Sequence, residues 1–172
     1  MHQFIKVFLE IILWRRGPQD LPASRFLVWV TLAAYLMVSV AQLALLNEPA
    51  ATWLFFLVVD PLLLMSMVWL VLKLYGRSAR YNQTISAVLG CSALLGLLVY
   101  LPLHMVLIGN LSESNSGAAQ LAALFEVTVF VLVTGRIIER ATDSSMFTGV
   151  AVALTYFIVS ISLFGLLSTS GG

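Results

Sequence analysis

The sequence predicts an all-α integral membrane protein, a bundle of five transmembrane helices preceded by an N-terminal amphipathic helix at the membrane interface. Of the 172 residues, 60% are hydrophobic and only 10% are charged, whereas a soluble domain carries about 45–50% apolar and about 25% charged residues. Five apolar stretches are long enough to cross a hydrocarbon core, which takes about 20 residues. All nine Lys and Arg fall on one side of the resulting five-span arrangement.

Short polar connections separate the predicted spans and contain helix breakers such as "NEPA" and "YGRSAR". None of them is long enough to hold a soluble domain, so residues 1–172 form a single membrane domain. The predicted spans cover residues 26–46, 53–73, 83–108, 118–138 and 147–167.

The positive residues predict how the chain is oriented, because cytoplasmic loops of membrane proteins are enriched in Lys and Arg. They precede the first span or flank the second-to-third and fourth-to-fifth connections: Lys6, Arg15, Arg16, Arg25, Lys73, Arg77, Arg80, Arg136 and Arg140. We therefore expect a cytoplasmic N-terminus and a C-terminal tail outside. The net charge of +1 gives no reason to expect nucleic acid as a partner.

Residues 1–16 have the pattern of a helix that lies in the membrane interface. Gln3, Lys6 and Glu10 recur at helical spacing and form one narrow polar stripe in an otherwise apolar segment that ends in Trp14. The segment is too short to span, so an interfacial position follows. A cleaved secretory signal peptide is the alternative, although Lys6 and Glu10 interrupt its apolar region.

Residues 17–25 form an elbow between this helix and the first span. Gly17 and Pro18 end the first helix, and Pro22 holds the preceding residue in an extended conformation. The flanking arginines can reach lipid phosphates, and the acid of the elbow either pairs locally or is offered to a partner. The interaction candidates of this region are Arg15, Arg16, Asp20 and Arg25.

Four polar residues lie within predicted spans: Asp60 in the second, His104 in the third, Glu126 in the fourth and Gln42 in the first. Ionisable groups inside a membrane are costly and suggest a function. At about 1.5 Å per helical residue, all four lie in the outer half of the bundle and can form one cluster. The acids serve either as protonated structural links between helices or as a site for protons, ions or a polar partner group.

Backbone features of the spans give two further expectations. Pro61 and Pro102 each break the hydrogen-bond ladder, near the carbonyls of Leu57 and Leu98. Pairs of small residues at a spacing of four allow close helix contact, either within the chain or between copies. These pairs are Ser86 with Gly90, Ser92 with Gly96, and Gly149 with Ala153.

The sequence carries no recognisable catalytic constellation. A nucleophile elbow, a phosphate-binding loop and an HExxH pattern are all missing. One well-placed His and two separated acids lack the spacing of zinc ligands, and Cys91 is expected to be a small packing residue in a helix. We therefore predict no catalytic, cofactor-binding or metal-binding residues and a protein that is not an enzyme.

The layout of a cytoplasmic N-terminal segment, five closely spaced spans and an outward C-terminus resembles the Yip family of membrane proteins, especially its small prokaryotic relatives. The stretch "GRIIERATDSSMFTGVAVAL", residues 135–154, is similar to that family's fourth-to-fifth connection. Eukaryotic members carry Asp-Leu-Tyr-Gly-Pro before the first span, where this chain has Asp20, Leu21 and Pro22. The resemblance implies a non-enzymatic protein that binds other membrane proteins or affects membrane organisation.

From these features we expect a multi-pass protein of the cell inner membrane that acts as an accessory or scaffold protein. Its expected partners are the lipid bilayer and another membrane protein or further copies of itself. The alternative is a small transporter or proton-coupled membrane subunit that uses Asp60 and Glu126.

Overall fold

The computed structural model describes residues 2–110 and 116–170, and every regular element within these ranges is a helix. Five of the helices in the described ranges are long and apolar enough to cross a membrane: Arg25–Leu46, Thr52–Leu74, Ser78–Ile108, Gly117–Thr142 and Met146–Leu166. They agree with the five predicted spans, so the predicted fold class is confirmed. Most of the third-to-fourth connection and the last two residues of the predicted outer tail lie outside the described residues.

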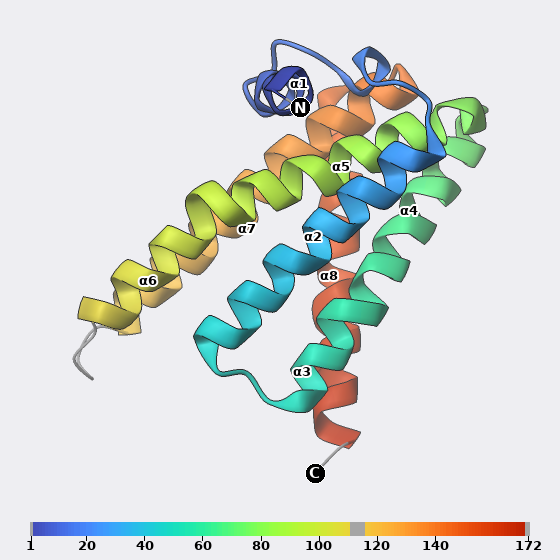
Figure 1. The fold of residues 1–172 in the computed structure, drawn as a ribbon. Coiled ribbons are helices and arrows are strands. Elements are labelled where there is room, and N and C mark those ends of the chain that lie inside the picture. Colours follow the sequence, from blue (N-terminus) through green and yellow to red (C-terminus); the bar gives the residue numbers. More distant parts are fainter. Residues whose placement is uncertain (1, 111–115, 171–172) are drawn as a thin grey trace.

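Two of the five spans are built from two α-helical parts (Figure 1). The second span joins α3 to α4, and the third joins α5 to α6. In chain order the α-helices are α1 (His2–Ile12), α2 (Arg25–Leu46), α3 (Ala50–Leu54), α4 (Asp60–Leu74), α5 (Tyr81–Leu95), α6 (Leu101–Asn110), α7 (Ser116–Thr142) and α8 (Met146–Ser170).

A π-helical turn lies just before the proline in each divided span, at Phe55–Val59 before Pro61 and at Gly96–Tyr100 before Pro102. Proline lacks an N–H and its ring crowds the carbonyl four residues earlier. In the second span the N–H of Asp60 instead donates to the carbonyl of Phe55, five residues back, which widens the helix at this point. The predicted breaks in the two ladders therefore take the form of wide turns.

Helix α1 crosses one end of the bundle. In Figure 1 it is seen end-on, whereas the spans are seen from the side. Phe8 and Ile11 are buried, whereas Ile5 and Leu9 are exposed. The ring of Phe8 lies against Gly90 of α5, where a Cβ atom would collide with it. The helix thus has one apolar face on the bundle and another that is free to meet lipid.

A hydrogen bond between the Asp20 side chain and the backbone stabilises the elbow. The backbone N–H of Gly17 donates to the carboxylate of Asp20 at 2.9 Å, across the 3-10 turn Pro18–Asp20. Gln83 of α5 donates from its side chain to the carbonyl of Leu21 at 2.7 Å. Asp20 thus pairs locally, with the backbone of its own turn.

Small residues bring the helices close together within the chain. Gly149 of α8 lies so near α7 that a Cβ atom there would overlap the carbonyl oxygen of Gly135. Gly96 lies against the side chain of Val38 on α2. Together with Gly90, these residues show that the small-residue pairs predicted from the sequence are used for packing inside one molecule.

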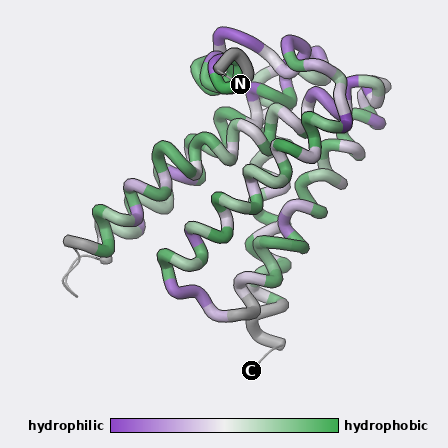
Figure 2. Tube along the Cα trace, viewed as in Figure 1, coloured by the Kyte–Doolittle hydropathy of each residue, from purple (hydrophilic) through white to green (hydrophobic). Residues whose placement is uncertain are grey.

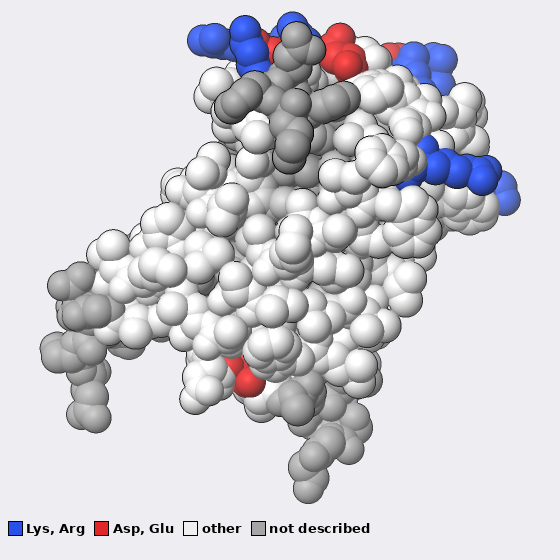
Figure 3. Space-filling view, in the orientation of Figure 1, with Lys and Arg blue, Asp and Glu red and all other residues white. Residues whose placement is uncertain are grey.

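Polar residues gather at the ends of the bundle, and the helices between them are mainly apolar with isolated polar positions (Figure 2). The Lys and Arg side chains lie at the end that carries α1 and the elbow (Figure 3), which we call the cationic end.

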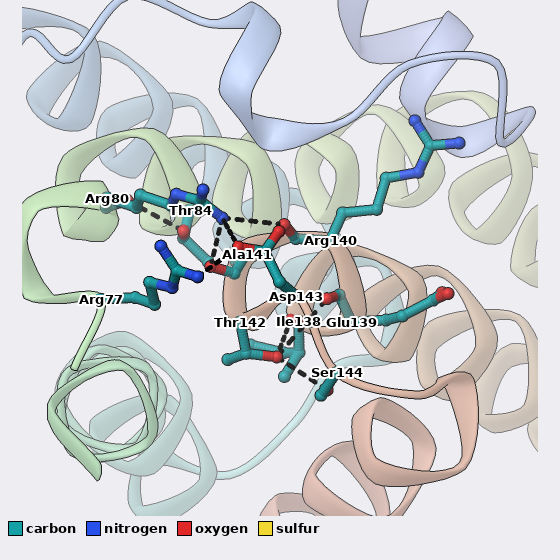
Figure 4. A network of polar contacts seen from close by, with 10 residues as sticks. All are labelled: Arg77, Arg80, Thr84, Ile138, Glu139, Arg140, Ala141, Thr142, Asp143 and Ser144. Atoms are coloured by element: carbon teal, nitrogen blue, oxygen red, sulfur yellow. Dashed lines mark hydrogen bonds and ion pairs between the residues drawn. The ribbon is translucent and has the colours of Figure 1, made fainter. Parts of the chain in front are cut away.

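A polar network at the cationic end joins the α4–α5 turn to the α7–α8 turn (Figure 4). Asp143 accepts from Arg77 at 2.9 Å and from Arg80 at 3.0 Å. Arg80 also donates to the carbonyl of Ala141 at 3.0 Å, near the end of α7. The hydrogen bond from Arg80, together with the charges of both arginines, lowers the pKa of Asp143 below its ordinary value.

Candidate functional site

A cavity of about 310 Å³ lies in the half of the bundle away from the cationic end. In this half the α6–α7 pair leans away from α2, α3 and α8 (Figure 1). The cavity is lined by Tyr35, Val38, Ser39, Gln42, Leu43, Leu46, Glu48, Thr52, Phe56, Ser92, Gly96, Tyr100, His104, Glu126 and Phe130. Four of the five spans therefore contribute to one partly polar space.

Three of the four polar residues predicted to cluster meet in this cavity: Gln42 from α2, His104 from α6 and Glu126 from α7. His104 Nε2 lies 3.2 Å from Glu126 Oε1, and about a fifth of each side chain is exposed. The Tyr100 hydroxyl donates to the backbone carbonyl of Glu126 at 3.2 Å. The third and fourth spans are thus held together at the cavity wall by both a side-chain and a backbone contact.

Asp60 is set apart from the cavity lining and is almost completely buried, with 4% exposed. The Tyr35 hydroxyl donates to its Oδ2 at 2.7 Å, while Tyr156 and Ser160 donate to its Oδ1 at 2.5 and 2.9 Å. These donors offset the high cost of burying a carboxyl group without partners. The prediction of one four-residue cluster is therefore wrong for Asp60, which does not line the cavity and is hydrogen-bonded instead to Tyr35, Tyr156 and Ser160.

Tyr35 connects the two parts of the site, because it lines the cavity and also donates to Asp60. Sequence reasoning missed this residue and the two donors on α8. The signals were nonetheless present: Tyr35 lies two helical turns before Gln42, and Tyr156 and Ser160 lie one turn apart. A hydroxyl group inside an apolar span does not reveal its partner in the sequence, because the partner depends on which residue lies opposite it in the fold.

Glu48 is a second acid of the cavity that the sequence analysis did not single out. It lies in the connection between α2 and α3, where its backbone carbonyl accepts a hydrogen bond from Trp53 at 3.0 Å. In the sequence it is part of the breaker "NEPA", which indicates a loop and gives no sign of an inward position.

The candidate interaction residues of the N-terminal region lie at the cationic end. Arg16 pairs with Glu10 of α1 at 2.7 Å, and Asp20 closes the elbow. Arg15 and Arg25 are exposed. Two of the four candidates thus make contacts within the chain.

The cavity combines hydrogen-bonding groups with acidic side chains. It offers two carboxyl groups, an imidazole, an amide and several hydroxyls. In the described part of the chain, no group of three or more His, Cys, Asp or Glu is arranged to hold a metal ion.

Comparisons of the chain with protein-family models, with curated proteins and with solved structures gave no match. The resemblance to the Yip family therefore stays a prediction, and the function must be argued from the site itself.

Proposed function

We propose that this multi-pass membrane protein binds a small polar solute in the cavity, as a small transporter or a solute-binding subunit does. The observation that carries the proposal is the convergence of Gln42, His104 and Glu126 on one cavity inside the spans. Intramembrane ionisable groups are costly and typically face a polar pathway or a binding site. A concave space with a few convergent polar groups is the usual form of such a site.

The two π turns support the same proposal. They contribute Phe56, Gly96 and Tyr100 to the cavity wall. Interrupted helices commonly surround the solute sites of secondary transporters, because irregular backbone is tolerated at membrane depth where it lines a cavity. Both interruptions in this bundle border the same space.

The proposed orientation places the cationic end in the cytoplasm, since Lys and Arg accumulate on the cytoplasmic side of membrane proteins. The N-terminus is then cytoplasmic, the C-terminus is outside, and the cavity lies in the outer half of the inner membrane. A solute would enter it from outside.

Thermal unfolding in lipid nanodiscs tests the proposal while the solute is still unidentified. We expect the low-molecular-mass fraction of a cell extract to raise Tm by several degrees, because a ligand at a hundred times its Kd stabilises by about 2.7 kcal/mol. The shift should disappear in the double variant Glu126→Gln/His104→Gln. Ser66→Ala, an exposed α4 position outside the cavity, is the matched control and should keep the shift.

The Tm of each variant without extract shows whether it still folds. If the extract shifts no protein, or shifts the double variant as much as wild type, the cavity is not the solute site and the proposal is wrong.

An accessory or scaffold role is the second candidate, and the exposed positions of Arg15 and Arg25 favour it. Both flank the elbow at the cationic end, where a partner or anionic lipid can reach them. If this role holds, a membrane protein that co-purifies with wild type in mild detergent should be lost from Arg15→Ala/Arg25→Ala. It should be retained by Glu126→Gln.

A further inference from the structure

Four aromatic side chains line the cavity: Tyr35, Phe56, Tyr100 and Phe130. They come from α2, from each of the two π turns and from α7, so rings approach the space from several sides. Aromatic faces carry partial negative charge and attract cations, and cages of such rings recognise quaternary ammonium groups.

The lining of the cavity contains acidic side chains and neither Lys nor Arg. Glu48 and Glu126 contribute carboxyl groups to the lining, and His104 is its remaining ionisable side chain apart from the two tyrosines. The Lys and Arg residues lie at the cationic end. An anionic ligand would face two acids with no Lys or Arg in the lining to balance its charge.

We propose that the cavity binds a small organic cation, an amine or a quaternary ammonium compound. This inference rests on the proposed function and adds the class of solute. The cationic group pairs with Glu126, where it competes with the His104 contact at 3.2 Å, and the aromatic rings surround its alkyl groups. Gln42 and Ser39 are placed to hydrogen-bond a polar substituent.

The volume sets the size of the ligand. At about 310 Å³ the cavity lies at the lower limit of the roughly 300–1,000 Å³ typical of ligand sites. A small amine or a quaternary ammonium compound such as choline fits this space.

Titration calorimetry of the protein in lipid nanodiscs tests the inference with named probes. The cations are choline, tetramethylammonium and putrescine. Their counterparts are 3,3-dimethylbutan-1-ol, which has the shape of choline without its charge, and the anion propionate. We expect at least one cation to bind, and choline to bind about tenfold more tightly than its uncharged counterpart, as a desolvated cation–π contact of about 2 kcal/mol allows.

Two pairs of variants locate the binding. Glu126→Gln should weaken cation binding about tenfold, because a lost partly buried charge contact costs of the order of 1.4 kcal/mol. Ser66→Ala should leave cation binding unchanged. Tyr100→Leu should weaken it, and Tyr100→Phe, which keeps the ring, should largely preserve it. Tm measured without ligand identifies any variant that fails to fold.

The outcomes separate this inference from the proposed function. If the extract shifts Tm and propionate or the uncharged alcohol binds in preference to the cations, the solute class is wrong while the cavity remains a solute site. If cations bind but Glu126→Gln and Tyr100→Leu have no effect, the inferred site is wrong. If neither the extract nor any probe acts, the proposed function and the inference fail together.

Discussion

Asp60 joins three spans through one carboxyl group. It lies in the second span and accepts hydrogen bonds from hydroxyl groups of the first and the fifth spans. Because one donor, Tyr35, also lines the cavity, a change in the carboxyl group alters the wall of the candidate site. This acid therefore has a structural role whatever the cavity binds.

Two substitutions at Asp60 should differ in effect. Asn keeps an oxygen acceptor and should cost about 1 kcal/mol of unfolding free energy, the net worth of a single hydrogen bond. Leu leaves three hydroxyls without their acceptor and should cost clearly more, about 3 kcal/mol or above, since each unsatisfied buried polar group costs about 1–3 kcal/mol. Reversible unfolding in mixed detergent micelles measures both. Equal losses for the two variants would contradict the role of the hydroxyl contacts.

Asp143 should make stability depend on pH. Its pKa in the folded protein lies below the ordinary 3.8 because Arg80 and Arg77 favour the carboxylate. A lowered folded-state pKa adds stability above the ordinary value, and this is lost as the pH falls through the folded-state pKa. The side chain is half exposed, so the effect is small.

Asp143→Asn should accordingly lower Tm at neutral pH, and the difference from wild type should shrink below about pH 4. Asn is a suitable replacement because the backbone here is left-handed, with φ of 56°, which Asn tolerates. A difference in Tm that stays constant with pH would show that the ion pairs contribute nothing.

At the scale of elements, the α7–α8 contact can be probed at Gly149, where an added Cβ atom would meet the nearest neighbour found at any described glycine. Gly149→Ala places a methyl group against the carbonyl of Gly135, and a backbone atom has no room to move aside. We expect a loss of about 1–3 kcal/mol or more, the range for overpacking. Gly117→Ala, where a Cβ atom meets nothing within 4 Å, is the control and should be neutral or slightly stabilising in the same unfolding assay.

The elements themselves were predictable from the sequence, because hydropathy and length alone identify spans. The five predicted ranges and the positions of the breaks before Pro61 and Pro102 agree with the structure. The meeting of Gln42, His104 and Glu126 also followed from their similar depth. The depth of a residue along its helix could be predicted from the sequence, since each residue adds a fixed rise.

The rotation of each helix about its axis was not predictable in the same way. Lipid and protein interior are both apolar, so the outer face of a span resembles its inner face in composition. This is why Asp60 was placed with Glu126 and why Tyr35 was overlooked. Glu48 was missed for a different reason, since a connection has no periodic pattern that indicates direction.

At the scale of the whole molecule, charge is divided between two halves. The Lys and Arg residues share the cationic end with Glu10, Asp20, Glu139 and Asp143, several of which pair with them. The other half contains Glu48, Asp60 and Glu126. This division underlies both the proposed orientation of the bundle and the proposed preference of the cavity for cationic solutes.

If the cavity binds a solute that enters from outside, it must be open to water on the side opposite the cationic end. Labelling of single cysteines by a membrane-impermeant thiol reagent, in a Cys91→Ala background, tests it most directly. We expect Gln42→Cys to react from one side of the membrane and Arg15→Cys only from the other. Ile158→Cys, on the exposed apolar surface of α8, should react from neither. A Gln42→Cys protein that reacts from neither side, or from the same side as Arg15→Cys, would contradict the account.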